Sequence, residues 1–194
     1  MSKGKLTKEH ILNQAFGIAS REGLESLTIG ELAKQCQMSK SGLFAHFNSK
    51  VNLQVAVVEY ADATFQTRVI APVREHQHEL VIDKLKHLID NWMCWNQSFQ
   101  GSCMFIDAWR DNRQDELQVS LRKAIYRWIS YLTIQIEKAV ETGELKKDLD
   151  VKQAAFELYG HYLSGHVFYS LVGQEESSQR FWNSVTKSFE SWSS

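Results

Sequence analysis

The chain has 194 residues, 43% of them apolar, which excludes a disordered tail and allows one sizeable core or a small domain joined to a larger one. Its single proline favours long helices, and its three cysteines (Cys36, Cys94 and Cys103) form no CxxC pair, which favours a reduced, cytoplasmic protein. The net charge of −1 favours no class of partner, and the N-terminus shows no apolar run typical of a signal peptide.

Helical periodicity runs through the whole chain, with no internal repeat and no alternating strand. Nine helices are expected, over about residues 7–22, 28–35, 40–47, 50–72, 80–97, 103–111, 115–142, 151–172 and 176–192. Gly23 has the position of a C-terminal glycine, Thr28–Glu31 matches a capping box, and Ser39 matches a helix N-cap. The fold is therefore expected to be all-α, with domains over residues 1–50 and 51–194.

The helices expected over 28–35 and 40–47 are joined by a three-residue turn and follow another helix, which is the pattern of a helix-turn-helix unit. Such a unit places its second helix in the DNA major groove, with polar groups at the N-terminal end and an apolar back. Lys40 and Ser41 supply the polar groups, and Gly42 leaves room for close approach. Leu43 and Phe47 are expected to anchor the back of the helix.

The distribution of charge supports this assignment. Residues 1–50 contain seven Lys or Arg against four acids, whereas the remaining residues contain 15 against 19. A basic end on an acidic body is typical of a surface that meets phosphate. The helix starts at Thr28, Ser39 and Lys50 would add free backbone N–H groups, which attract phosphate oxygens.

Over about residues 7–55 the chain resembles the TetR family of regulators. The resemblance rests on TIGELA from Thr28 and MSKSGLFAHFNSK ending at Lys50, with Ile11–Phe16 and Gly23 before them. It implies an all-α, dimeric DNA-binding regulator, usually a repressor that a small molecule releases from a palindromic operator. The residues expected to contact double-stranded DNA are Thr28, Ser39, Lys40, Ser41, Gly42, Phe44, His46 and Lys50.

One residue departs from the family pattern. The family commonly has tyrosine where this chain has Phe44, and the tyrosine hydroxyl reaches a phosphate. A phenyl ring cannot make that bond, so the resemblance assigns the phosphate contact of this segment to His46. We therefore expect His46→Ala to weaken binding to all DNA sequences alike.

Aromatic side chains are dense after residue 90, and at helical spacing they fit either a core or a pocket for a small apolar or aromatic effector. The residues predicted to line such a pocket are Trp92, Trp95, Phe105, Trp109 and Tyr159. Arg110, Arg127 and His161 are candidate polar contacts, although each also fits a paired or surface residue.

The last two helices are apolar on more than one face, which requires burial on both sides. The stretch 154–172 contains Glu157, His161 and His166, so a buried or interface helix is favoured over a membrane span. A homodimer would cover the second face and set two recognition helices about 34 Å apart on a palindrome. The residues predicted at the dimer interface are Leu158, Tyr162, Phe181, Val185, Phe189 and Trp192.

Two other classes remain open at this point. A ligand-binding or redox-sensing helical protein without DNA binding is one, since Cys94 and Cys103 flank a loop, although buried free thiols are commoner. An enzyme is disfavoured because the sequence shows no nucleophile elbow, phosphate-binding loop or zinc signature. No cofactor and no metal site are expected, and His76 and His78 are interpreted as surface residues.

Overall fold

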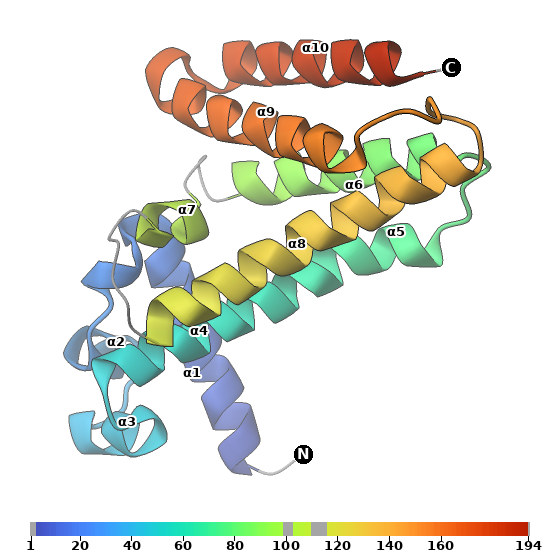
Figure 1. Ribbon diagram of the computed structural model, residues 1–194. Coiled ribbons are helices and arrows are strands. Elements are labelled where there is room, and N and C mark those ends of the chain that lie inside the picture. The colour runs from blue at the N-terminus through green and yellow to red at the C-terminus, as the bar shows by residue number, and fades with distance from the viewer. Residues whose placement is uncertain (1–2, 99–102, 110–115, 194) are drawn as a thin grey trace. The chain divides into compact units, whose positions relative to one another are not determined.

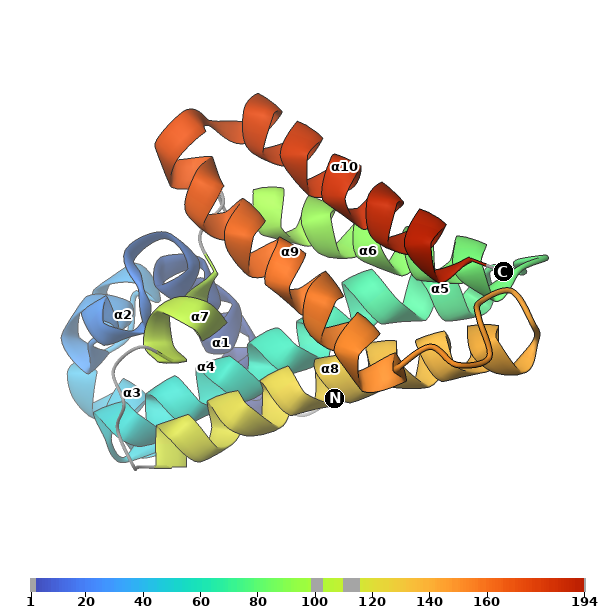
Figure 2. The ribbon, with the colours of Figure 1, turned by 45° about the horizontal axis from the view of Figure 1, so that its top comes forward.

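The structure is a computed structural model that describes residues 3–98, 103–109 and 116–193, which are almost entirely helical (Figures 1 and 2). Its helices are α1 (Lys3–Glu22), η1 (Leu24–Ser26), α2 (Ile29–Gln35), α3 (Lys40–Phe47), α4 (Lys50–Phe65), η2 (Gln66–Ile70), α5 (Ala71–Glu75), α6 (Val81–Gln97), α7 (Met104–Trp109), α8 (Glu116–Glu141), α9 (Val151–Val172) and α10 (Gln174–Trp192). The all-α fold expected from the sequence is confirmed. None of the described helices is long and apolar enough to cross a membrane.

The expected helix over 50–72 is present as three consecutive segments. The α-helix α4 passes into a π-helical turn, η2, and then into the short α5. Pro72 stands in the first turn of α5, where its missing N–H and its ring disturb the normal pairing with the turn before it. The wide π turn absorbs this disturbance, so the chain stays helical as far as Glu75.

The chain forms two compact units. The first spans residues 1–66 and 102–125, and the second spans 67–101 and 126–194. The contacts of α4 therefore place it with α1–α3, whereas the sequence suggested a boundary at residue 50. In the first unit, the Phe16 ring meets the Tyr60 ring edge-on at 6.0 Å, and the Tyr60 hydroxyl donates to Asn13 Oδ1 at 3.3 Å. These contacts hold α4 on α1.

The second unit is built around an aromatic cluster between α6, α8 and α9. The Trp92 ring stacks on Tyr162 with centroids 4.0 Å apart, lies 5.8 Å from Tyr159 and meets Trp128 edge-on at 5.2 Å. The Tyr162 hydroxyl donates to Asn96 Oδ1 at 3.0 Å, which satisfies both polar groups inside the core.

Helices α9 and α10 form an antiparallel pair, visible at the top of Figure 1, that turns at Gly173. Gly173 has a φ of 86°, a left-handed value that suits glycine. The Phe181 ring of α10 packs against Gly165 of α9, 3.6 Å from the point where a Cβ would lie. The pair therefore buries one apolar face of each helix within the chain.

This packing corrects the predicted dimer interface. All six residues assigned to it face the interior of the chain, with at most 5% of each exposed, so they are core residues. They are Leu158, Tyr162, Phe181, Val185, Phe189 and Trp192. Helix α9 does carry apolar residues on two sides, but the side assigned to a partner is the one that packs inside the chain.

Helix α6 receives its N-terminal cap from a residue far along the chain. The carboxylate of Glu144 accepts hydrogen bonds from the backbone N–H groups of Val81 (3.0 Å) and Ile82 (2.9 Å). The Thr142 hydroxyl donates to the same carboxylate at 2.8 Å. Burial raises the pKa of Glu144, but these three hydrogen bonds outweigh it, so the pKa lies below its ordinary value.

We expect Glu144→Gln to lower the free energy of unfolding by about 1–2 kcal/mol at neutral pH, because it removes a charged cap. A carboxylate whose folded pKa is lowered contributes stability above the unfolded pKa, near 4.5, and loses that contribution as the pH falls through the folded pKa. The difference from wild type in urea denaturation should therefore shrink below about pH 4. The exposed neighbour Glu141 supplies the control, and Glu141→Gln should show no such pH dependence.

Candidate nucleic-acid interface

Helix α3 is a short, well-capped helix with one buried and one exposed side. Ser39 Oγ accepts from the Gly42 N–H at 3.0 Å, and Asn48 closes the other end in the left-handed region with a φ of 63°. Leu43 and Phe47 are buried on the back of the helix, as expected. The exposed side presents Lys40, Ser41, Phe44 and Ala45.

The turn between α2 and α3 sets the angle of the second helix. Gln37 has a left-handed φ of 54°, and the Met38 N–H returns to the Ala33 carbonyl at 2.9 Å, which closes the end of α2. Leu32 and Ala33 hold the inner side of α2. The structure therefore contains the helix-turn-helix geometry that the spacing predicted.

Gly42 has a role within the helix itself. A Cβ at this position would lie 3.0 Å from Ser39 Oγ, closer than side chains ordinarily pack. The glycine therefore makes room for the Ser39 cap, and room for DNA is not needed to explain it. The Ser41 hydroxyl hydrogen-bonds the Ser39 hydroxyl at 3.2 Å, so the start of α3 is ordered by its own side chains.

Three helices of this unit begin with a capping hydroxyl. Thr28 Oγ1 accepts from the Glu31 N–H at 3.2 Å, Ser39 Oγ from Gly42, and Ser49 Oγ from the Asn52 N–H at 3.0 Å. Ser49 was not singled out from the sequence, although a serine directly after the left-handed Asn48 is a signal for it. Each start leaves further backbone N–H groups that can meet an anion.

Lys50, a predicted DNA contact, is held within the unit. Its ammonium donates to the Glu25 carbonyl at 2.7 Å and to Glu25 Oε2 at 3.1 Å. One turn later, the buried Gln54 amide donates to the Leu24 carbonyl at 2.9 Å. Together these two side chains tie the start of α4 to η1. Sequence reasoning missed Gln54, because a polar residue inside a helical stretch resembles a surface residue.

Lys40 and His46 are the remaining predicted contacts. Lys40 is exposed, and its side chain runs beside Gly30, where an added Cβ would lie 3.4 Å from Lys40 Cε. The lysine side chain therefore lies along the start of α2. His46 is half-buried, with its ring 6.2 Å from that of Phe47. The structure brings all eight predicted DNA-contacting residues into the first unit.

The five predicted effector-binding residues fall in both units. Trp92, Trp95 and Tyr159 belong to the second unit, whereas Phe105 and Trp109 belong to the first. Trp92 and Trp95 are buried, and Trp109 is exposed beside the Arg122 guanidinium, 5.7 Å from its ring centroid. Of the polar candidates, Arg127 is exposed and Arg110 lies outside the described residues.

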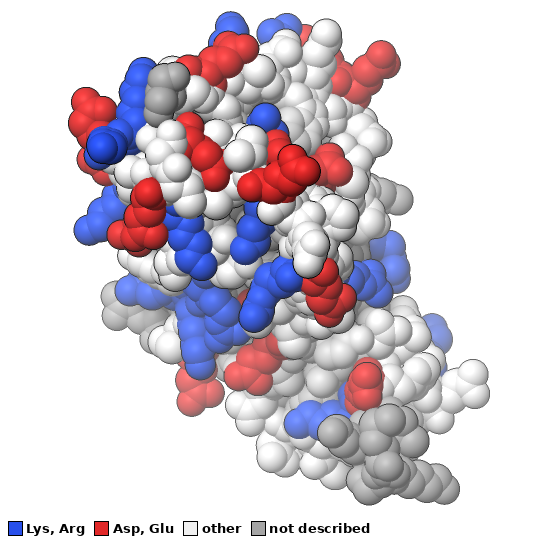
Figure 3. Space-filling view, turned by 90° about the vertical axis from the view of Figure 1, so that its right-hand side faces the viewer, with Lys and Arg blue, Asp and Glu red and all other residues white. Residues whose placement is uncertain are grey.

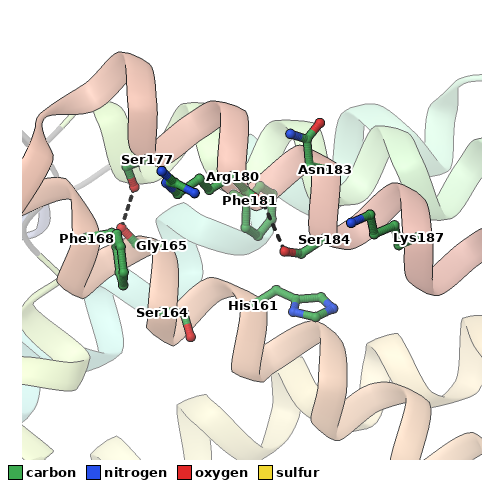
Figure 4. Close-up of a pocket in the computed structure, with 10 residues that line it drawn as sticks. All are labelled: His161, Ser164, Gly165, Phe168, Ser177, Arg180, Phe181, Asn183, Ser184 and Lys187. Atoms are coloured by element: carbon green, nitrogen blue, oxygen red, sulfur yellow. Dashed lines mark hydrogen bonds between the residues drawn. The ribbon is translucent and has the colours of Figure 1, made fainter.

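A hollow of about 370 Å³ lies along α9 and α10 (Figure 4). His161, Ser164, Arg180 and Lys187 give it a polar lining, and none of the five predicted effector-binding residues contributes to it. His161 hydrogen-bonds the Ser188 hydroxyl at 2.8 Å, and burial lowers its pKa despite the opposing charge of Glu157. The lining fits contact with a polar group better than an aromatic effector.

His76 and His78, which were expected at the surface, lie beside His87. His78 Nε2 lies 3.1 Å from His87 Nδ1, and the His76 ring centroid is 4.8 Å from that of His78. Burial and the positive charges of its neighbours lower the pKa of His78. Among the described residues, no group of histidine, cysteine or acidic side chains is arranged to hold a metal ion.

Positive side chains also lie close together in the second unit. Lysine and arginine side chains form a band on the face drawn in Figure 3, with acidic groups beside them. Burial and the charges of Lys138 and Arg74 lower the pKa of Lys84, so these three side chains lie near one another. Clustered lysine and arginine side chains are therefore not confined to the N-terminal residues.

None of the three cysteines forms a disulfide. The Cys94 side chain is largely exposed, but partial burial of its thiol and the charge of Asp90 raise the pKa of that thiol. A sensing cysteine needs a lowered pKa, because the thiolate is the reactive form. The redox alternative is therefore disfavoured for Cys94.

Comparison with known proteins agrees with this geometry. Residues 11–57 match the family model of bacterial regulatory proteins, tetR family, and residues 81–185 match that of the tetracyclin repressor-like C-terminal domain. The nucleoid occlusion factor SlmA of Marinobacter nauticus is 25% identical over 149 residues, which cover 76% of this chain and 73% of that protein.

Solved structures show the same fold. A TetR-family transcriptional regulator from Cytophaga hutchinsonii superposes with a TM-score of 0.85 at 18% identity, covering 100% of this chain and 98% of that one. AibR in complex with isovaleryl coenzyme A and operator DNA gives a TM-score of 0.68 at 19% identity, over 90% of this chain and 94% of that one. These solved structures therefore share the fold of this chain.

Proposed function

Because this chain belongs to the TetR family of bacterial regulatory proteins, we propose that it is a homodimeric repressor that leaves a palindromic operator when a small apolar or aromatic effector binds. The family accounts for DNA binding and transcription regulation. The helix-turn-helix geometry of α2 and α3 is the observation that carries the proposal. The operator contacts, the dimer and the effector response go beyond what membership of the family establishes, and we propose them.

The proposed DNA contacts follow from the exposed side of α3. Lys40 and Ser41 face the base edges, and Leu43 and Phe47 hold the helix in place. His46 and the capped helix starts at Thr28, Ser39 and Ser49 take phosphates. Lys50 acts mainly through Glu25, since its ammonium is already engaged there.

The proposed dimer forms through the outer side of α9. Phe156, Leu163, Val167 and Leu171 are exposed and recur every four or seven residues, so they form one ridge along the helix. Gly160 lies on the same ridge, with open space where a Cβ would stand, which lets a second helix approach. Exposed apolar faces of this length mark association sites.

The hollow of Figure 4 lies next to this ridge, since Ser164 and Phe168 belong to both α9 and its lining. In the dimer, side chains of the second copy would occupy it, and the Arg180 guanidinium, which pairs with Glu176, would lie at the rim. Antiparallel pairing of two such ridges would give an isologous contact, as a two-fold dimer requires.

The proposed effector site is the aromatic cluster at Trp92. The rings of Trp92, Tyr159 and Tyr162 offer flat apolar surfaces to an aromatic molecule. On α8, Gln135 is 2% exposed, and its Oε1 finds no hydrogen-bond partner among the described residues. Gln135 lies two turns after Trp128 and on the same side of the helix, so it can accept a hydrogen bond from an effector.

The deciding experiment is a gel-shift with DNA flanking the gene of this protein, followed by selection from a random DNA library. Binding to one palindromic sequence at low salt, reversed by a small aromatic compound that also raises the melting temperature, is the expected result. Absence of binding to every fragment at low salt would overturn the proposal. Binding that no compound reverses would overturn the effector part alone.

Each Lys40 that binds a phosphate releases counterions from the DNA. Lys40→Met should therefore reduce the magnitude of the slope of log affinity against log salt concentration by about 1 for each Lys40 in the dimer. The exposed Lys147, in the loop between α8 and α9, gives a matched control of the same charge. Fluorescence anisotropy at several salt concentrations measures both slopes. An equal change for Lys147→Met would show that net charge alone, rather than the α3 surface, sets the slope.

A further inference from the structure

Phe44 is an unusual residue for the surface on which it lies. Half of its side chain is exposed (50%), and among residues 8–66 it is the one large apolar side chain with such exposure. It is not needed for the core of the helix-turn-helix unit, which Leu43 and Phe47 complete. The chain therefore exposes half of a phenyl ring at a position that the buried side of α3 does not use.

The ring shares its face with the polar contacts proposed above. Phe44 follows Lys40 by four residues and Ser41 by three, so the three side chains are neighbours on the exposed side of α3. Any DNA that Lys40 and Ser41 reach must therefore come close to the ring. On binding, the ring would lose its contact with water.

The chemistry of the groove limits what the ring can meet. A phenyl ring neither donates nor accepts a hydrogen bond, so it cannot bind a phosphate or a base edge as a hydroxyl would. The C5-methyl group of thymine is the one apolar group that the base pairs present in the major groove. We propose that Phe44 determines operator specificity by packing against a thymine methyl group in each half-site.

This inference rests on the proposed function and adds a specificity-determining residue to it. Replacing thymine by uracil removes the methyl group and leaves base pairing unchanged, so it tests the contact directly. The operator selected from the random library would be made with uracil at one thymine pair at a time, in both half-sites. Fluorescence anisotropy would measure the affinity of the full-length wild-type protein and of Phe44→Ala.

At one symmetrical pair of thymines we expect uracil to lower the affinity of the wild-type protein by about 4-fold per methyl group, or about 15-fold for both. The same change should have little effect on Phe44→Ala. Lys40→Ala is the matched control, and it should lose affinity for both DNAs while keeping the full effect of uracil. Phe44 is exposed, so the variant should fold, which its thermal denaturation would check.

The outcomes separate the two proposals. If the wild-type protein selects no DNA, the proposed function fails. If it binds an operator but uracil has no effect at any position, or affects Phe44→Ala equally, the ring packs on the sugar-phosphate backbone and this inference alone fails.

Discussion

Val167→Asp is expected to convert the dimer into a monomer and to lower operator affinity by more than about 100-fold. Val167 is 45% exposed in the single chain and lies on the α9 ridge between Leu163 and Leu171. In the proposed dimer each carboxylate would enter an apolar contact, and burying such a charge without a partner is strongly unfavourable. Losing the dimer removes the second half-site, which contributes through a high effective concentration.

Analytical ultracentrifugation measures the oligomeric state, and anisotropy measures operator affinity. Val119 provides a matched control, since it is also an exposed valine (67%) but belongs to α8. Val119→Asp should remain dimeric. A Val167→Asp protein that stays dimeric would show that another surface forms the interface. A monomer that retains full operator affinity would show that the dimer is not needed for binding.

Trp92→Ala is expected to lower the free energy of unfolding by about 3–5 kcal/mol. The side chain is 3% exposed and contacts the rings of Tyr159, Tyr162 and Trp128, so its removal leaves a cavity that three helices must close. A loss of this size is a large part of the stability of an ordinary domain. Urea denaturation, followed by circular dichroism, measures it.

Tyr126→Ala is the control for this substitution, since Tyr126 is an aromatic residue on α8 that is 64% exposed. It should change the free energy of unfolding by about 0.5 kcal/mol or less. A loss below about 1 kcal/mol for Trp92→Ala would mean that the cluster is loosely packed. In that case the cluster could admit an effector without rearrangement, and bound compounds should restore much of the lost stability.

Local signals predicted most of the helix-turn-helix unit. The capping hydroxyls of Thr28 and Ser39, the glycine at Gly23 and the apolar back of α3 depend on neighbours within four residues. Such contacts recur wherever the same residues occur at the same spacing. The helix-turn-helix unit could therefore be assigned before any distance was known.

Contacts between distant residues could not be predicted in this way. Glu144, which follows the C-terminal end of α8, caps the start of α6. Gln54 and Lys50, both in α4, bind carbonyl groups of η1. In the sequence Glu144 and Gln54 look like solvated surface residues, and Lys50 was predicted to contact DNA. Only the packing of helices brings each of them to a carbonyl or N–H group that needs a partner.

By itself the sequence determined the all-α fold, the helix-turn-helix unit and the two-faced apolar character of α9. The tertiary structure decided which face of α9 is internal, because Leu158 and Tyr162 are buried, with Tyr162 bonded to Asn96 of α6, while Leu163 and Val167 remain exposed. Helical periodicity reports how many apolar faces a helix has. It does not report which face the rest of the chain covers, because that depends on the positions of other helices.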